Sequence, residues 1–137
     1  MEYKIIKDNL NNKEKEIFTH LTHEDLKNIL DNKKDETVLL LKFGATWCGP
    51  CNKIKEFVYS MFLDMPENVC CFDLDVDENI ELYSALKKKR MVTTIPAFIV
   101  YYCKNKRDHW YIADNNISNS DKKVVLEFFK QIYNNVN

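Results

Sequence analysis

The apolar residues of this chain fall into short continuous runs and into longer stretches with helical spacing. The run TVLLLKF (37–43) is almost entirely apolar and has strand length, which is typical of a strand buried on both faces. The run NVCCFDLDV (68–76) predicts a second strand of this kind. Three shorter strands are predicted at residues 16–20 (EIFTH), 96–102 (PAFIVYY) and 108–113 (DHWYIA), the last two joined as a hairpin by the turn CKNKR.

Between these runs, apolar residues recur every three or four positions and predict four helices. The sequence THED (22–25) has the pattern of a capping box, so the first helix is expected to begin there. The second follows Cys48 and ends before Pro66, the third covers residues 78–90, and the fourth begins near Ser120. The residues that these helices are expected to bury are Leu26, Ile29 and Leu30 in the first, Ile54, Phe57, Val58 and Met61 in the second, Ile80, Tyr83 and Leu86 in the third, and Val124, Val125, Phe128, Phe129 and Ile132 in the fourth.

The predicted order of elements is βαβαβαββα. Strands that alternate with helices pair in parallel through crossover connections, and a late hairpin adds antiparallel strands. The chain is therefore expected to be an α/β protein in which a mixed central β-sheet is flanked by helices on both faces. No linker or internal repeat divides the sequence, so residues 16–137 are predicted to form one domain, preceded by a polar extension of uncertain order at residues 1–15.

Composition and charge exclude several classes of protein. The chain has 137 residues, of which 45% are hydrophobic and 30% charged, and this is enough to bury a core without disulfide staples. The 20 basic residues balance 21 acidic ones, so no excess of positive charge indicates binding to nucleic acid or to an anionic membrane. We find neither a signal peptide nor a segment long enough to span a bilayer. We expect a cytoplasmic protein, or an organellar or secretory one if a leader has been removed.

The chain has an odd number of cysteines, which does not fit the disulfide scaffold of a small secreted domain: Cys48, Cys51, Cys70, Cys71 and Cys103. A structural zinc site needs four ligands, and Cys48 with Cys51 supplies only two. Neighbouring residues of a strand point to opposite faces, so Cys70 and Cys71 cannot complete such a site together. The remaining candidates, His20 and His23, flank the start of a different helix. We therefore predict no metal site.

The spacing of Cys48 and Cys51 fits a redox couple better than a metal site or chance. Cys48 falls at the cap or in the first turn of a helix, where unpaired backbone N–H groups and the helix dipole stabilise a thiolate. Pro50 fits that turn because its missing N–H costs nothing there, and Gly49 leaves the sulfur approachable. Cys51, one turn further, is placed to attack a mixed disulfide formed on Cys48.

Two motifs extend this interpretation. The sequence FGATWCGPC (43–51), followed by TTIPAF (93–98), resembles the thioredoxin family, and the resemblance covers about residues 16–136. It implies the thioredoxin fold, which has the mixed α/β sheet predicted above. It also implies that Cys48 is the attacking thiol, that Cys51 is the resolving thiol, and that the two form a disulfide when oxidised.

The same resemblance assigns the surroundings of the couple to substrate binding. Trp47 is expected to cover the site, and Gly49 and Pro50 form the turn between the two thiols. Pro96 matches the cis-proline that faces the disulfide in this family. The Ile95-Pro96 bond is therefore predicted to be cis and to offer a ledge to the substrate backbone.

The sequence departs from the family at two charged positions. Family members usually have a buried Asp six residues before the first cysteine, where this chain has Lys42, and the Lys that often lies on the neighbouring strand corresponds to Asp73. Either Lys42 pairs with Asp73, because an unpaired charge in a buried strand is costly, or its ammonium group reaches solvent at the edge of the sheet. If Lys42 lies near Cys51, its positive charge would favour the Cys51 thiolate.

Three further departures concern the shape of the site. Glu56 replaces a proline that commonly kinks the long helix after the cysteines in this family, so a straighter helix is predicted. Ala97 stands where Thr usually follows the cis-proline, and Ala113 or Asp114 takes the place of a glycine at the end of the last strand. The last two changes are expected to alter the groove that receives the partner.

The predicted function is that of a protein-disulfide oxidoreductase working in the reducing direction. Its substrates would be disulfide-containing proteins, and an external reductase of the thioredoxin-reductase type would regenerate the dithiol. The chain itself needs no cofactor, and we expect a monomer. Two alternatives stay open: a disulfide oxidase or isomerase of a secretory compartment, and a non-catalytic or redox-gated binding module of the same fold. The Gly-Pro dipeptide between the cysteines resembles reducing members of the family.

The remaining candidate residues have simpler interpretations. Cys70 and Cys71 are predicted to be small core residues, with a redox-sensitive vicinal pair as the alternative. Cys103 ends a strand, and nothing in the sequence activates it. The run KKKR (87–90) complements the C-terminus of a helix. By the family resemblance this run lies near the active face, where it could steer acidic partners.

Overall fold

The computed structural model describes residues 15–136, so the predicted N-terminal extension lies outside the described residues except for Lys15. The elements along the chain are β1 (Ile17–Phe18), α2 (His23–Asn32), β2 (Val38–Gly44), α3 (Gly49–Lys53), α4 (Lys55–Asp64), β3 (Val69–Asp75), α5 (Ile80–Lys88), β4 (Ala97–Tyr102), β5 (Asn115–Ser118) and α6 (Lys122–Val136). This is the predicted order, with the second helix divided into α3 and α4. Within the described part of the chain, no helix has the length and apolar character needed to cross a membrane.

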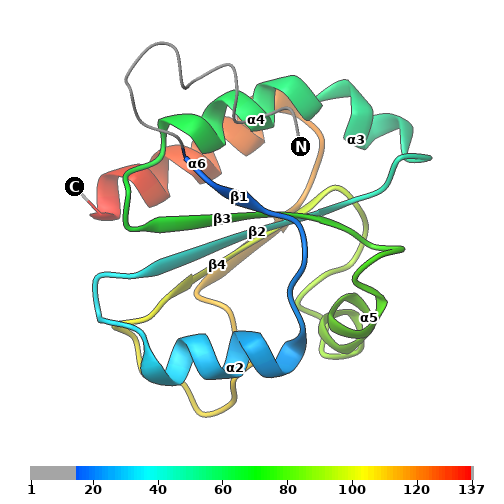
Figure 1. The fold of residues 1–137 in the computed structure, drawn as a ribbon. Helices are drawn as coiled ribbons and strands as arrows, with labels where there is room; N and C mark the ends of the chain where they lie inside the picture. The colour runs from blue at the N-terminus through cyan, green and yellow to red at the C-terminus, as the bar shows by residue number, and fades with distance from the viewer. Residues whose placement is uncertain (1–14, 137) are drawn as a thin grey trace.

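The strands form one mixed sheet in the order β1-β3-β2-β4-β5. β3 pairs in parallel with β1 and β2, whereas β4 runs antiparallel to β2 and β5. Helices α4 and α6 lie over one face of the sheet, and α2 and α5 lie over the other (Figure 1). The prediction of a mixed sheet flanked by helices on both faces is confirmed. Gly44 and Asp75, the last residues of β2 and β3, are partners in the sheet, so the segments that follow these two strands start side by side.

The sheet separates two apolar cores. On one side, Leu26 of α2 and Leu86 of α5 pack against the sheet. On the other side, the ring of Phe129 from α6 lies 5.7 Å from those of Phe62 in α4 and Phe98 in β4. Burying one such large apolar side chain contributes roughly 1.5–3 kcal/mol. These two cores hold α2, α4, α5 and α6 on a sheet whose central strand, β2, is buried along its whole length, as predicted.

The predicted burial of the helices is wrong at two positions. Ile80 is 61% exposed and Val124 is 39% exposed. Ile80 is the first residue of α5, and Leu82 takes its place on the buried face of that helix. Val124 lies about 100° around the helix from its neighbour Val125. Because Val125 is fully buried, Val124 is turned away from the sheet.

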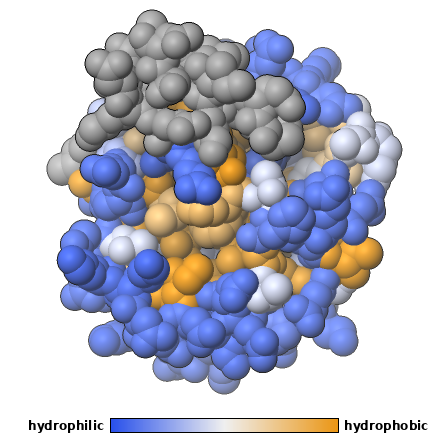
Figure 2. All heavy atoms as spheres, viewed as in Figure 1, coloured by the Kyte–Doolittle hydropathy of each residue, from blue (hydrophilic) through white to orange (hydrophobic). Residues whose placement is uncertain are grey.

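β1 is a two-residue strand at one edge of the sheet. Its Phe18 is 37% exposed, and the Phe18 ring lies 5.2 Å from that of Phe72. Lys15 fixes the start of β1, because its Nζ donates to the carbonyl oxygens of Pro66 and Val69 at 3.0 and 2.7 Å. Apolar surface shows in the middle of the face drawn in Figure 2, where β1 crosses the view, with hydrophilic residues to either side and below. Because β1 has only two residues, this edge of the sheet offers few free backbone N–H and carbonyl groups with which another chain could pair.

The long helix predicted after Cys48 is interrupted, so the expectation that Glu56 would leave it straight is wrong. Ile54, between α3 and α4, has φ −109° and ψ 9°. Cys51 packs in the core on the side of α2 and α5, whereas Ile54 and Val58 pack in the opposite core. The turn at Ile54 lets this stretch of chain contribute to both cores, and it requires no proline.

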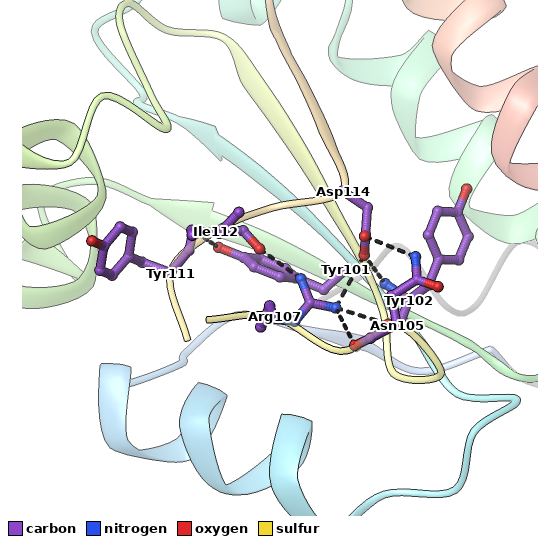
Figure 3. A network of polar contacts seen from close by, with 7 residues as sticks. All are labelled: Tyr101, Tyr102, Asn105, Arg107, Tyr111, Ile112 and Asp114. Carbon is purple, nitrogen blue, oxygen red and sulfur yellow. Dashed lines mark hydrogen bonds and ion pairs between the residues drawn. The ribbon is translucent and has the colours of Figure 1, made fainter. Parts of the chain in front are cut away.

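The strand predicted at residues 108–113 is also wrong, because those residues form a loop and the strand that pairs with β4 is β5. The side chain of Arg107 donates hydrogen bonds to backbone carbonyl groups of this loop (Figure 3). It donates from Nη1 to the carbonyl of Ile112 at 2.6 Å and from Nη2 to that of Tyr102 at 2.8 Å, and Nη2 lies 3.1 Å from Oδ2 of Asp114. Carbonyl groups held by a guanidinium need no strand partner, so the loop is stable without pairing.

Asp114 and Tyr101 complete the network that holds the loop (Figure 3). The Asp114 carboxylate accepts from the backbone N–H of Tyr102 at 2.6 Å and from Nδ2 of Asn105 at 2.8 Å. The hydroxyl of Tyr101 donates to the carbonyl of Tyr111 at 3.1 Å. Asp114, which the family resemblance places near the substrate groove, thus uses its carboxylate in this loop.

α5 ends in a Schellman motif whose left-handed residue is an arginine. The backbone N–H of Met91 donates to the carbonyl of Leu86 at 2.9 Å, and the backbone N–H of Arg90 donates to the carbonyl of Lys87 at 3.0 Å. Arg90 has a φ of 64°, and it is the one non-glycine residue with positive φ among residues 15–136. Glycine adopts this conformation freely, whereas a residue with a Cβ pays about 1 kcal/mol for it.

Candidate active site

Cys48 and Cys51 lie where β2 passes into α3. Cys48 is the N-cap residue of α3, and its Sγ accepts a hydrogen bond from the backbone N–H of Cys51 at 3.2 Å. The two cysteines form a disulfide, with their Cα atoms 5.3 Å apart. Pro50 occupies the first turn of the helix, and a methyl group added at Gly49 would meet no atom within 4 Å. Both cysteines are buried, whereas the turn formed by Gly49 and Pro50 is exposed.

Trp47 stands beside the disulfide and is held there by an aspartate. Its side chain is 67% exposed, and its Nε1 donates to Oδ2 of Asp77 at 2.8 Å. The backbone N–H of Asp77 donates in turn to Oδ1 of Asp75 at 2.7 Å. Sequence reasoning missed Asp77. The signal that could have found it is the acidic segment that follows β3, because that segment begins beside the one that follows β2.

The Ile95-Pro96 peptide bond is cis, as predicted, and it faces the disulfide. The carbonyl oxygen of Ile95 lies 4.0 Å from Sγ of Cys48. β4 begins at the next residue, Ala97, which pairs with Phe43 of β2. The start of β4 therefore holds the cis bond at the same end of the sheet as the cysteines.

Lys42 and Asp73 form an ion pair across the centre of the sheet. They are register partners on β2 and β3, and Nζ of Lys42 lies 3.5 Å from Oδ1 of Asp73. The Lys42 side chain is 6% exposed and that of Asp73 is 23% exposed. Of the two arrangements considered for Lys42, the structure shows pairing, because β2 is a central strand and offers no edge at which the ammonium group could reach solvent.

Lys42 also approaches Cys51. Both side chains lie close to Gly44. A methyl group added at Gly44 would be 3.4 Å from Cε of Lys42 and 3.5 Å from Sγ of Cys51. The distance between Cε of Lys42 and Sγ of Cys51 therefore cannot exceed the sum of these two distances. Lys42, Asp73 and Cys51 all line a cavity of about 230 Å³, which also borders Glu78. The ion pair and Cys51 of the disulfide therefore line one cavity.

The family model named Thioredoxin matches residues 17–116, which include both cysteines and Pro96. The chain belongs to the thioredoxin family. "Thioredoxin 3" of Plasmodium falciparum is 27% identical to it over 121 residues, which cover 83% of this chain and 63% of that protein. A thioredoxin of Ophiophagus hannah is 33% identical over 78 residues, which cover 57% of this chain and 69% of that protein.

A solved structure shows the same fold. The thioredoxin of Trichomonas vaginalis aligns with a TM-score of 0.62 and 25% sequence identity, over 84% of this chain and 96% of that chain. Membership of the thioredoxin family, together with paired cysteines at a strand–helix junction, supports thiol–disulfide exchange as the chemistry of this site. This chain carries that site with the Lys42–Asp73 pair behind it.

The other three cysteines lie apart from this thioredoxin-family site. Cys71 is fully buried, and burial raises the pKa of its thiol to about 12. Burial also raises the pKa of Cys103. Cys70 packs against the core on the side of α2 and α5, whereas Cys71 belongs to the opposite core. A thiol with a raised pKa is a poor nucleophile near neutral pH, so the buried Cys71 is poorly placed for thiol–disulfide exchange.

The histidines considered as zinc ligands have carboxylate partners. Nε2 of His20 lies 3.7 Å from Oε1 of Glu78, and Nδ1 of His23 lies 3.1 Å from Oε1 of Glu81. Across residues 15–136, no group of three or more His, Cys, Asp or Glu side chains is arranged to hold a metal ion. The structure thus does not bring His20 and His23 together with the cysteine pair.

Proposed function

We propose that this thioredoxin-family domain is a protein-disulfide oxidoreductase that works in the reducing direction. In the dithiol form, the Cys48 thiolate attacks one sulfur of a substrate disulfide and releases the other substrate sulfur as a thiolate. The Cys51 thiolate then attacks Sγ of Cys48, which releases the second substrate thiolate and forms the Cys48–Cys51 disulfide. Two electrons pass to the substrate, and its two thiolates take up protons from solvent.

The observation that carries the proposal is the position of the cysteine pair between an exposed turn and the cis-proline. A substrate segment can lie across Trp47, Gly49 and Pro50, which are exposed, and reach the sulfur of Cys48 next to the Ile95 carbonyl. The resolving thiol belongs to the same chain, so the second step is intramolecular. Effective molarities of well-oriented intramolecular reactions reach about 10⁵ M or more, which makes this spacing a larger advantage than the acidity of either thiol.

The reducing direction and the partners belong to the same proposal. The Gly49-Pro50 dipeptide between the cysteines resembles reducing members of the family. Disulfide-containing proteins are the substrates, and an external donor of the thioredoxin-reductase type returns the Cys48–Cys51 disulfide to the dithiol. Such a cycle fits a reducing compartment such as the cytoplasm, with the domain acting as a monomer.

We propose further that Lys42 supports the resolving step by its charge. At an effective dielectric constant of about 20, two unit charges within about 8 Å of each other attract by roughly 2 kcal/mol or more. The Lys42 ammonium therefore stabilises a thiolate at Cys51, and Asp73, which holds Lys42 in place, offsets part of this effect. Lys42 acts here as a positioning charge and not as the acceptor of the Cys51 proton.

Reduction of insulin by dithiothreitol, followed by turbidity, tests the proposed activity. The wild-type domain is expected to accelerate precipitation, whereas Cys48→Ser should leave only the rate of dithiothreitol alone, because the attacking thiolate is gone. Cys103→Ser is the matched control and should keep the wild-type acceleration. A wild-type domain with no acceleration would contradict the proposal and favour a binding module without turnover.

A further inference from the structure

A strongly basic surface at the end of α5 has no part in the chemistry described above. Residues 87–90, which we call the basic end of α5, are four consecutive Lys or Arg residues, and all four are exposed. No acidic residue occurs between residues 82 and 95, a segment that leads to the cis-proline. In Figure 1, α5 lies at the end of the sheet where α3 begins. The charge is therefore concentrated at the active-site end of the molecule.

Arg90 is placed at a position where the fold would favour glycine. Its φ of 64° belongs to the left-handed residue of the Schellman motif. Its side chain is exposed, and no hydrogen bond or ion pair ties it to the rest of residues 15–136. Neither the backbone nor the packing therefore explains an arginine here. A strained residue that the fold does not need is evidence for a functional role of its side chain.

Two aromatic rings hold neighbouring charges of this surface in place. Nζ of Lys87 lies 5.6 Å from the centre of the Tyr83 ring, and Nζ of Lys89 lies 4.9 Å from that of Tyr111. A cation held over an aromatic face loses less conformational freedom when a ligand binds than a free lysine does. Tyr111 belongs to the loop that Arg107 and Asp114 fix, so the surface has a rigid support.

We propose that the basic end of α5 binds an acidic segment of the protein substrate, a run of Asp or Glu residues close in sequence to the disulfide that Cys48 attacks. This inference rests on the proposed function. Ile95, whose carbonyl lies 4.0 Å from Sγ of Cys48, is five residues from Arg90. Five extended residues span at most about 17 Å. Carboxylates within about five residues of the substrate cysteine can therefore reach the basic end.

The proposed partner is a short acidic segment and not a long polyanion. The basic end supplies four charges on a chain whose net charge is −1, so it lacks the extended positive surface that a nucleic acid would require. Attraction between exposed charges is screened over a Debye length of about 10 Å at 0.1 M salt. The contribution of the basic end should therefore decrease as the salt concentration rises.

A matched pair of peptides tests the proposal. Each carries one cysteine in a mixed disulfide with a chromophoric aryl thiol, followed by four Glu residues in one peptide and four Gln residues in the other. Attack by Cys48 of the pre-reduced domain releases the aryl thiol, and its absorbance gives the rate constant. We expect the wild-type domain to react about tenfold faster with the Glu peptide at 20 mM salt, and this ratio should fall to about twofold or less at 0.5 M salt.

Substitutions at Arg90 separate docking from stability. Arg90→Gly should lower the Glu-to-Gln rate ratio about threefold and raise the midpoint of urea unfolding, because glycine accepts a φ of 64° without strain. Arg90→Lys keeps the charge and should keep the ratio. Lys88→Gln should lower the ratio, whereas the control Lys27→Gln, at an exposed position of α2, should not.

Three results would overturn the proposal. Equal wild-type rates with both peptides would show that no acidic segment is recognised. A ratio that survives Arg90→Gly and Lys88→Gln would place the recognition elsewhere. An oligonucleotide that abolishes the preference at the concentration of the Glu peptide would show a general polyanion site. No reaction with either peptide would refute the proposed function itself, which is a different outcome from equal rates.

Discussion

Two ion pairs in this molecule are buried to a similar degree and are built in opposite ways. The Arg107 guanidinium, whose side chain is 10% exposed, contacts Asp114 and also donates to the carbonyls of Tyr102, Asn105 and Ile112. Lys42 lies 3.5 Å from Asp73, which is longer than the usual hydrogen bond of about 2.9 Å. It also lines the cavity behind the disulfide.

The difference is the basis for assigning a structural role to the Arg107–Asp114 pair and the proposed functional role to the Lys42–Asp73 pair. A buried charge surrounded by fixed acceptors holds a loop in one conformation, and any further change of charge nearby would only disturb it. The Lys42 ammonium has one long contact to Asp73 and lines the same cavity as Cys51, so under the proposed function it responds to the charge of the Cys51 thiolate. Substitutions in and around the two pairs test this contrast.

Removal of Arg107 should have the largest effect on stability. Arg107→Ala removes the positive partner of the Asp114 carboxylate and the donor to the carbonyl of Ile112, and this should lower the free energy of unfolding by about 3 kcal/mol. Urea denaturation measures the loss. The pH profile of insulin reduction should not move. A loss of stability below about 1 kcal/mol would show that the loop does not depend on this pair.

Cys71 tests the effect of burial on an ionisable group that belongs to neither ion pair. Because burial raises the pKa of Cys71 to about 12, its thiol stays protonated in the folded state at pH 9–11, whereas it ionises with a pKa of about 8.5 in the unfolded chain. The unfolded state then binds fewer protons, so this contribution to stability is complete below pH 8.5 and falls by up to about 1.4 kcal/mol per pH unit above it. Cys71→Ala should make the decline of unfolding free energy between pH 9 and 11 shallower, and an unchanged slope would contradict the account.

Loss of Lys42 should change reactivity more than stability. Without the ammonium group the Cys51 thiolate is less favoured, so Lys42→Ala should lower the rate of insulin reduction roughly tenfold at pH 7 and displace the pH profile upward. Circular dichroism should show that the fold is kept. An unchanged pH profile would show that Lys42 has only a structural role.

Substitution of Asp73 should give the opposite displacement, of smaller size. Asp73→Asn removes the charge that offsets Lys42 and keeps an oxygen that can accept from Nζ. The pH profile should therefore move downward, with a rate at pH 6 roughly threefold above wild type. A displacement in the same direction as that of Lys42→Ala would mean that the two residues act as one unit.

The sequence predicted the parts of this molecule that depend on local patterns. The apolar run of β2, the capping residue Thr22 and the position of Cys48 before a helix follow from residue type and spacing, and they place the disulfide correctly. Comparison of positions 42 and 73 with the family pattern indicated the Lys42–Asp73 pair. The sequence left it equally open whether Lys42 pairs with Asp73 or reaches solvent at the edge of the sheet.

The features that the sequence did not predict depend on contacts between distant residues. The break at Ile54 reflects two cores on opposite sides of the sheet, and no local residue signals it. Residues 108–113 have the composition of a strand, but Arg107 binds the loop's carbonyl at Ile112 and so replaces strand pairing. The left-handed Arg90 and the hydrogen bond from Trp47 to Asp77 likewise become visible only in three dimensions.

The most direct test of the central claim is the reduction potential of the Cys48–Cys51 couple, measured by equilibration with a glutathione buffer. A protein-disulfide reductase requires a dithiol that gives up its electrons readily. We therefore predict a potential at or below the cytosolic glutathione poise of about −220 to −260 mV. A potential well above that range would mark the domain as an oxidant and contradict the proposed direction of the reaction.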